Sequence, residues 1–313
     1  MTWVTWRLQR TETLIAVGIL ALIAALLVPT GISMASAYRH DGLSACLGTN
    51  PSFSCGNAIG DFQARFQSLF SLLNWFTLIP GLIGVLLAAP FILELENGTY
   101  RLAWTQSVTR RRWIASKLAV PIAAAMLIAA ALILLTTWWR APFVHLDGRM
   151  ETGTYDSEGT VVFGYTLFAL GLALALGVIW RRAVAAVTLA FVGYFVARIF
   201  VDTWLRDRLV APAKATWHPA AGQPADLNHA NIISQSGTGP GVVLRQGSGL
   251  LGGPHGGVAA VPRGFGLGPT TMHAVYQPAS HFWPLQGVET GLFVAVALVL
   301  IAFAAWWTQR RTA

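Results

Sequence analysis

Polar side chains that could take part in binding or catalysis gather at only a few places in this chain of 313 residues. The densest group, residues 94–113, contains two carboxylates, an Asn-Gly pair and three consecutive arginines at 110–112. A plain turn would be enough to join the apolar runs on either side of it. The longer polar sequence therefore indicates a segment that docks another molecule.

Local signals predict how this docking segment is built. Pro90 bends the end of the preceding helix, and Asn97-Gly98 is a helix stop. Apolar side chains then recur at helical spacing and predict a short amphipathic helix: Tyr100, Ala103, Trp104 and Val108. Thr109 is placed to cap the next helix. A helix that lies on the membrane surface without a protein partner remains the alternative interpretation.

A loop that binds ATP is absent from the sequence. Such a loop needs Gly-x-x-x-x-Gly-Lys followed by Ser or Thr, because the lysine reaches the phosphates and the hydroxyl holds magnesium. The two lysines, Lys117 and Lys214, neither follow a glycine nor precede a serine or threonine. We therefore expect no cofactor and no enzyme activity on this chain.

Histidine and cysteine offer two further kinds of site. No pair of the later histidines has ligand-like spacing and no cysteine joins them, so we expect no metal site there: His218, His229, His255, His273 and His281. Cys46 and Cys55 are close in sequence. A disulfide between them is expected in an oxidising compartment, and two unpaired thiols are the alternative.

Arg198 and Asp202 are the first candidates for a transport path, because charged groups deep in a membrane are usually functional. Counted at ~1.5 Å per residue from Arg182, Arg198 lies ~24 Å into a core ~30 Å thick, close to its far surface. Asp202 follows Arg198 at i+4. An ion pair along one helix face is therefore the expected role of these two residues.

Six long uncharged stretches must position these residues. An apolar run of ~20 residues is what one helix needs to cross a bilayer core. The stretches lie between Glu12 and Arg39, Arg65 and Glu94, Lys117 and Arg140, Glu158 and Arg181, Arg182 and Arg198, and Glu289 and Arg310. The predicted fold class is an all-α membrane protein with six transmembrane helices in one domain, residues 1–313.

The composition agrees with a membrane protein. With 55% apolar and only 11% charged residues, the chain has too little polar surface to coat a water-soluble globule. Most of the 13 tryptophans flank the apolar runs, as is typical of residues at membrane interfaces. The arginines and lysines that give the chain a net charge of +8 are scattered among the apolar runs. The expected partners of this charge are therefore the headgroups of membrane lipids and not nucleic acid.

The distribution of Lys and Arg predicts the orientation, because short basic loops stay in the cytoplasm. Bases lie before the first run, after the sixth, and in two connections: Arg7, Arg10, Arg101, Arg110, Arg111, Arg112, Lys117, Arg181, Arg182, Arg310 and Arg311. Both termini and the docking segment are then cytoplasmic, and 33–65, 140–158 and 202–288 are external. A cleavable leader is the alternative for the first run, but residues 14–34 exceed a usual leader core of ~7–15 residues.

The external segment 202–288 divides in two by composition. Gly and Pro crowd 222–269, where no helical or strand period is visible, so a flexible loop is expected. The flanking pieces, 203–210 and 276–288, suit short re-entrant or interfacial elements.

The docking segment resembles the signature that follows the second helix in type-2 ABC exporter permeases. The resemblance is carried by Glu94, Glu96, Gly98 and Thr99, then Val108 and Arg110, then Lys117. Residues 106–110 and 277–289 are also similar to phrases that recur in a bacterial branch of such permeases. The insert at 222–269 departs from the family, whose external helices before the last span are shorter.

The resemblance implies the membrane-spanning subunit of an ATP-driven exporter in a bacterial plasma membrane. It implies two partners, a separate ATP-binding subunit and a second copy or relative of this permease that shares the path. The residues implied in coupling to the ATPase are Glu94, Glu96, Gly98, Thr99, Tyr100, Trp104, Val108, Arg110 and Lys117. Within this set, Glu94 and Glu96 would anchor the end of the second helix, and Gly98 and Thr99 would form the turn.

Two other classes of protein remain as alternatives. An ion-coupled secondary transporter normally has carboxylates or broken helices near the middle of the membrane, often with internal repeats, and none is visible here. An intramembrane hydrolase, the less favoured alternative, needs catalytic groups within the core, whereas every histidine falls in an external segment.

Overall fold

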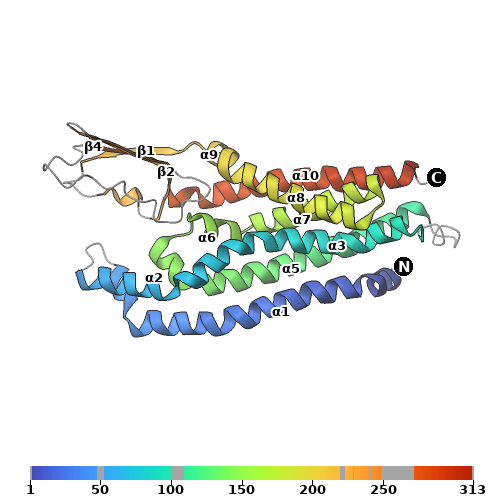
Figure 1. The fold of residues 1–313 in the computed structure, drawn as a ribbon, viewed down its shortest axis with the longest axis horizontal. Helices are drawn as coiled ribbons and strands as arrows, with labels where there is room; N and C mark the ends of the chain where they lie inside the picture. Colours follow the sequence, from blue (N-terminus) through green and yellow to red (C-terminus); the bar gives the residue numbers. More distant parts are fainter. Residues whose placement is uncertain are drawn as a thin grey trace.

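A computed structural model describes residues 2–47, 53–99, 109–218, 223–227, 229–239, 242–247 and 271–311. The fold is mostly helical, and the long helices run side by side along one axis (Figure 1). Its α-helices are α1 (Thr2–His40), α2 (Phe53–Leu73), α3 (Ile79–Glu96), α5 (Arg110–Asp147), α6 (Thr152–Ser157), α7 (Val161–Trp180), α8 (Ala183–Phe200), α9 (Arg206–Leu209) and α10 (Phe282–Arg311). Short turns of other helix types are η1 (Leu43–Leu47), η2 (Asn74–Leu78), the π-helical η3 (Val201–Leu205), η5 (Ala225–Leu227) and η6 (Ala279–His281).

Six helical stretches of the described chain are long and apolar enough to cross a membrane, which confirms the predicted number. They are Thr13–His40, Trp75–Glu96, Arg110–Leu146, Val161–Trp180, Ala183–Leu209 and Ala279–Arg310. Large apolar side chains on these stretches are exposed, for example Val184 at 82% and Leu22 at 74%. Such surfaces are stable only when hydrocarbon surrounds them. The chain is therefore a multi-pass membrane protein.

The central helix of the bundle is α7, which contacts α3, α5, α8 and α10. Its close approach to α3 depends on glycine. A Cβ added to Gly84 of α3 would collide with the carbonyl oxygen of Thr166, and one added to Gly177 of α7 would lie 2.5 Å from the side chain of Ile92. Close packing of this kind holds helices together in hydrocarbon, where no hydrophobic force drives them against one another.

A four-stranded antiparallel sheet, which the sequence analysis did not predict, extends beyond the helices. Its strands β1 (Ala213–Trp217), β2 (Asn231–Gly239), β3 (Val242–Gly247) and β4 (Thr271–Gln277) lie in the order β1-β4-β2-β3. The all-α fold class was therefore wrong for this segment, and β2 and β3 fall within the stretch 222–269 that was expected to be a loop without strands. The flanks are helical, since η3 and α9 continue α8 and η6 leads into α10.

The physical reason for the missed strands is that their pairing is non-local. Ser and Gly dilute β2, and both are weak strand formers. The strand is held by β4, which follows it only after a long Gly-rich stretch. A small apolar cluster of Leu227, Ala274 and Tyr276 supports the sheet. The sequence of β2 has no alternation of apolar and polar residues from which a strand could be predicted.

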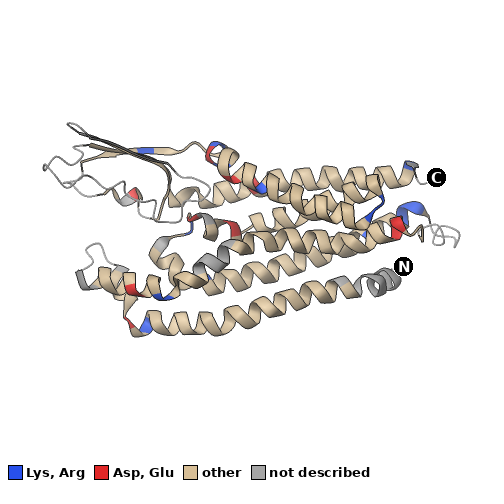
Figure 2. Cartoon of the chain, in the orientation of Figure 1, with Lys and Arg blue, Asp and Glu red and all other residues tan. Residues whose placement is uncertain are grey.

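The two ends of the bundle differ in what they carry. Both chain termini lie at one end, here named the terminal end, whereas α2 and the sheet lie at the other, here named the sheet end (Figure 1). Most of the helical length between the two ends carries no charge (Figure 2). Charged side chains are concentrated towards the ends, and the candidate sites lie there.

Candidate functional site

At the terminal end, an ion pair joins the two helices that flank the docking segment. Lys117 of α5 donates a hydrogen bond to Oε1 of Glu94 at the end of α3, and both side chains are largely buried. Loss of either partner would leave a buried charge uncompensated, which costs about 3–5 kcal/mol in proteins. The pair therefore fixes α3 and α5 to one another where the docking segment leaves α3.

Glu96 makes a second connection, to the start of α8. Its Oε2 accepts a hydrogen bond from the backbone N–H of Ala183, the first residue of α8, at 2.8 Å. A carboxylate at this position satisfies an unpaired helix N–H and interacts favourably with the positive end of the helix dipole. The turn before α8 is tight, and Arg181 adopts a left-handed φ of 51° there. Glu96 thus links the end of α3 to the turn between α7 and α8.

Gly98 and Thr99 begin the docking segment. Gly98 has a φ of +69°, a conformation that costs other residues about 1–2 kcal/mol, so a glycine is suited to this turn. The hydroxyl of Thr99 donates to the carbonyl oxygen of Glu94 at 3.5 Å. Arg110 is the first residue of α5. Thr109 precedes it in the N-cap position, but its side chain makes no capping hydrogen bond.

The remaining candidates for coupling, Tyr100, Trp104 and Val108, lie outside the described residues, as does the amphipathic helix predicted for them. The described part of the site therefore consists of the two flanks of that segment. Glu94, Glu96, Gly98 and Lys117 are brought together there with the turn at 181–182, which the sequence analysis had placed on the same side of the membrane.

At the sheet end, a disulfide joins Cys46 to Cys55, with their Cα atoms 5.5 Å apart. It links the end of η1 to the first turns of α2. This cross-link constrains the connection between the first span and α2.

Arg198 and Asp202 do not form the ion pair that the i+4 spacing predicted. The chain changes from α-helix to π-helix at Val201, between these two residues. Asp202 pairs instead with Arg206, and Arg198 pairs with acids on two other helices. The prediction was wrong because the partners of Arg198 are distant in sequence.

These residues belong to a buried charged cluster at the sheet end of the bundle. We define the charged cluster as Tyr155, Asp156, Tyr165, Arg198, Asp202, Arg206 and Glu289. Its members come from α6, α7, α8, η3, α9 and α10. All of them except Asp202 are buried, and Glu289 is 0% exposed.

The two arginines share two acids within the charged cluster. Asp156 accepts from Nη2 of Arg198 at 2.7 Å through one oxygen and from Nη2 of Arg206 at 2.6 Å through the other. Glu289 accepts from Nε of Arg206 at 3.2 Å and lies 3.4 Å from Nη1 of Arg198. Burial alone would raise the pKa of Asp156, but the two guanidinium groups outweigh it and hold this pKa below its usual range.

Two tyrosines complete the charged cluster. The hydroxyl of Tyr155 donates to Glu289 at 3.0 Å, and that of Tyr165 donates to the other oxygen of the same carboxylate at 2.5 Å. The guanidinium carbon of Arg206 lies 4.4 Å from the ring centre of Tyr155, and that of Arg198 lies 3.9 Å from the ring centre of Tyr165. Such cation–π contacts are strong when they are shielded from water.

Gln286 holds the start of α10 against its neighbours, and Gln277 holds the end of β4 to the residue that follows α9. The amide of Gln286 donates to the carbonyl oxygens of Tyr155 and Glu158, at 2.9 and 3.2 Å, and its oxygen accepts from the N–H of Val161 at 2.9 Å. Gln277 donates to the carbonyl oxygen of Val210 at 2.8 Å. Polar residues from the motif at 277–289 therefore join α10 to α6 and α7, and β4 to the end of α9.

Glu158, between α6 and α7, is a further buried acid, which lies outside the charged cluster as defined. It is 3% exposed, and its Oε1 makes no hydrogen bond among the described residues. Burial raises the pKa of Glu158 to about 7, although Arg140 and Arg149 oppose the shift. Arg140 itself donates to the hydroxyl of Ser157 at 2.7 Å. Glu158 thus titrates close to neutral pH.

The charged cluster was missed because its members look like the ordinary ends of separate apolar runs. Asp156 and Glu289 each lie next to such an end, more than a hundred residues apart in the chain. A usable signal was present in the motif at 277–289, whose Gln286 and Glu289 make these contacts. A second signal was charge balance, since the three arginines of the helical stretch 183–209 outnumber its two acids, Asp202 and Asp207.

Comparison with known proteins gives one finding. A family model described as ABC-2 membrane transporter related matches residues 17–206, which is more than half of the chain. The match begins in α1 and extends to the start of α9, so it includes three of the six membrane stretches in full, most of two others, and the docking segment. Neither a curated protein nor a solved structure matches the chain.

Proposed function

Because the chain belongs to the ABC-2 membrane transporter related family, we propose that it is the permease subunit of an ATP-driven exporter. The permease forms the transmembrane path, and a separate subunit binds and hydrolyses ATP with magnesium. The observation that carries the proposal is the match of the family to a chain with six membrane stretches and no loop for ATP.

The terminal end supports a mechanism for coupling. The docking segment runs from Gly98, just after α3, to Arg110, the first residue of α5. Next to this segment, the ion pair between Glu94 and Lys117 joins α3 to α5. Glu96 connects the same place to α8. A force applied to the segment by the ATP-binding subunit therefore reaches three membrane helices together.

The proposed cycle uses this connection. When ATP closes the partner subunits, the docking segment moves, and α3, α5 and α8 move with it and open the path towards the sheet end. Two permeases, identical or related, contribute to the path at their interface. In this arrangement the terminal end is cytoplasmic, the sheet end is external, and the membrane is a bacterial plasma membrane.

An experiment on the native complex tests the proposal and identifies the partner at the same time. The tagged chain is purified from the membranes of its host, and co-purified proteins are photolabelled with an azido derivative of ATP. We expect a labelled polypeptide distinct from the permease. Gly98→Ala, which strains the left-handed turn without a steric clash, should reduce its recovery, and Trp104→Ala should do the same.

The matched control is Gly291→Ala, because a Cβ there also meets nothing within 4 Å and the backbone φ is ordinary. The control should retain the labelled polypeptide. Equal recovery with the wild type and the Gly98 variant, both correctly inserted in the membrane, would count against docking through this segment. The absence of any nucleotide-binding partner would count against the function as a whole.

An ion-coupled secondary transporter is opposed by the state of the two acids of the charged cluster that are buried, whereas Glu158, outside that cluster, keeps an unbonded carboxylate oxygen among the described residues. Asp156 and Glu289 are each bonded to both Arg198 and Arg206, so neither presents a free carboxylate to a coupling ion. Transport into vesicles separates the two functions. An ATP-driven exporter requires ATP with its partner subunit and continues when the ion gradient is abolished.

A further inference from the structure

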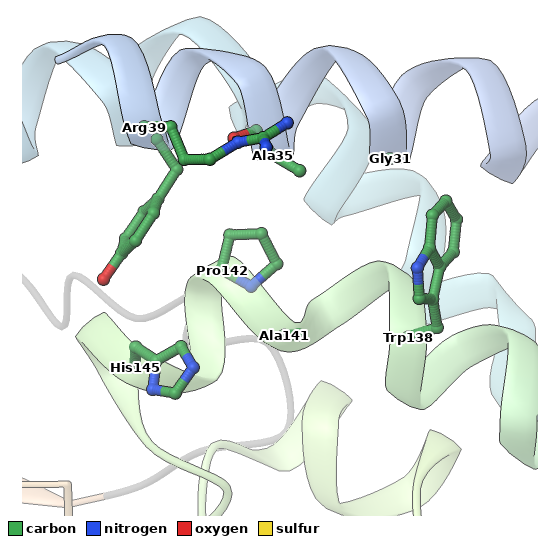
Figure 3. Close-up of a pocket in the computed structure, with 8 residues that line it drawn as sticks. Gly31, Ala35, Arg39, Trp138, Ala141, Pro142 and His145 are labelled. Atoms are coloured by element: carbon green, nitrogen blue, oxygen red, sulfur yellow. The ribbon is translucent and has the colours of Figure 1, made fainter. Parts of the chain in front are cut away.

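A groove between α1 and α5 lies near the sheet end of the membrane-spanning helices. It has a volume of ≈ 260 Å³, and its lining includes Ala35, Arg39, Trp138, Pro142 and His145. Figure 3 shows Pro142 near its centre, Trp138 at one end and Arg39 with His145 at the other. Its lining residues Arg39, Trp138 and Ala141 are exposed.

The walls of the groove are suited to a hydrocarbon chain. Its lining combines small side chains on α1 with the rings of Trp138 and Pro142 on α5. Apolar side chains of the same two helices are exposed, including Ile32 of α1 at 57% and Leu134 of α5 at 72%. In a membrane these side chains face lipid. The distance along α5 from Trp138 to His145 is about 10 Å, which accommodates the upper part of one acyl chain.

The end of the groove that faces the sheet end of the bundle carries the guanidinium of Arg39 and the imidazole of His145. Arg39 and His145 lie in the last turns of α1 and α5, and both are exposed. Arg39 donates from Nε to the carbonyl oxygen of Ala35 at 3.1 Å, which holds the guanidinium over the groove. In the described chain no carboxylate forms an ion pair with Arg39, because the nearby Asp41 pairs with His40 instead.

We propose that this groove binds one anionic phospholipid from the leaflet at the sheet end. The acyl chain lies along Ala35, Pro142 and Trp138, and the phosphate accepts hydrogen bonds from the terminal nitrogens of Arg39 and from the ring of His145. The combination of an apolar channel with a guanidinium at the end of one span and an imidazole at the end of the other matches the two parts of such a lipid. This inference is independent of ATP coupling.

Native mass spectrometry of the full chain released from nanodiscs tests the proposal. The nanodiscs contain equal amounts of phosphatidylglycerol and phosphatidylcholine, and the retained lipid is counted for each oligomeric state. We expect one phosphatidylglycerol per chain to be retained in preference. Arg39→Gln should weaken its retention about fivefold, the effect of one lost charge at a membrane surface. Ala35→Trp should abolish it by filling the groove.

The matched control is Arg65→Gln, which removes an exposed arginine from α2 outside the groove. It should retain the lipid, and the thermal midpoints of all variants should show that they are folded. Equal retention of both lipids by the wild type, or unchanged retention in Arg39→Gln, would overturn the proposal. The proposal would also be overturned if the wild type formed a dimer without bound lipid and Ala35→Trp disrupted that dimer, because the groove would then be a contact between two copies.

Discussion

Substitution of Glu289 by Gln tests the charged cluster at its most buried acid. The change removes one negative charge and almost no volume. Glu289 is 0% exposed and receives hydrogen bonds from Tyr155, Tyr165 and Arg206. In the variant, Arg198 and Arg206 share Asp156 as their one fully buried carboxylate, and an amide N–H faces hydroxyl groups that had been donors. The start of α10 should therefore be held less firmly.

The size of the expected loss of stability follows from the complete burial of Glu289. Breaking a buried ion pair by removal of one partner costs about 3–5 kcal/mol. For a chain of this size, such a loss lowers the thermal midpoint by on the order of 10 °C. The assay is thermal unfolding of the purified protein in detergent. Asp61→Asn is the matched control, because Asp61 is an exposed acid on α2 and its loss should change the midpoint little.

A double-variant cycle with Arg206→Gln shows whether the effect is due to the charge. Loss of both partners should cost less than the sum of the two single losses, because the second change removes the charge that the first left uncompensated. A Glu289→Gln variant as stable as Asp61→Asn would refute the claim that this network holds the sheet end together. Additive single effects would refute its attribution to the ion pair.

Three further predictions use other contacts. Glu158 has a pKa of about 7 in the folded protein against an ordinary value of 4.5, so the stability that its protonated form contributes is fully present below about pH 4.5 and is lost as the pH rises to about 7. The thermal midpoint should therefore fall less across this pH window in Glu158→Gln than in the wild type. Parallel pH profiles of the two proteins would contradict the raised pKa. Glu96→Ala should lower stability by about 0.5–2 kcal/mol through loss of the bond to Ala183, with faster amide hydrogen exchange confined to the start of α8, and unchanged exchange there would speak against the cap. Gly84→Val should lower the free energy of unfolding by about 1–3 kcal/mol or more, because the valine side chain would meet the backbone of α7 at Thr166, whereas Gly291→Ala should leave it unchanged. Equal thermal midpoints for the two variants would exclude the close contact of α3 with α7.

The membrane helices could be predicted from sequence because each is specified by its own residues. A run such as 161–180 is long, apolar and uncharged, and hydrocarbon requires that its backbone be hydrogen-bonded within the run. No distant residue has to be known. The family resemblance arose in the same way, from the local signature that begins at Glu94 and Glu96.

The charged cluster and the sheet could not be predicted in this way, because each depends on partners far apart in sequence. Arg198 has an acid four residues later, and local reasoning chose it, whereas the fold offers Asp156 and Glu289. Likewise, β2 contains weak strand formers and is stabilised by β4. Such pairings are set by how the helices pack, which a single sequence does not specify.

The location of the docking segment is the most direct test of the central claim that an ATP-binding subunit drives this permease through it. A cysteine introduced by Thr99→Cys, at an exposed position, is treated with a maleimide that cannot cross membranes, in intact and in permeabilised cells. Ser280→Cys, at the exposed opposite end, is the comparison. We expect Ser280→Cys to be labelled in intact cells and Thr99→Cys only after permeabilisation. Labelling of Thr99→Cys in intact cells would place the segment outside, where no ATP-binding subunit could reach it.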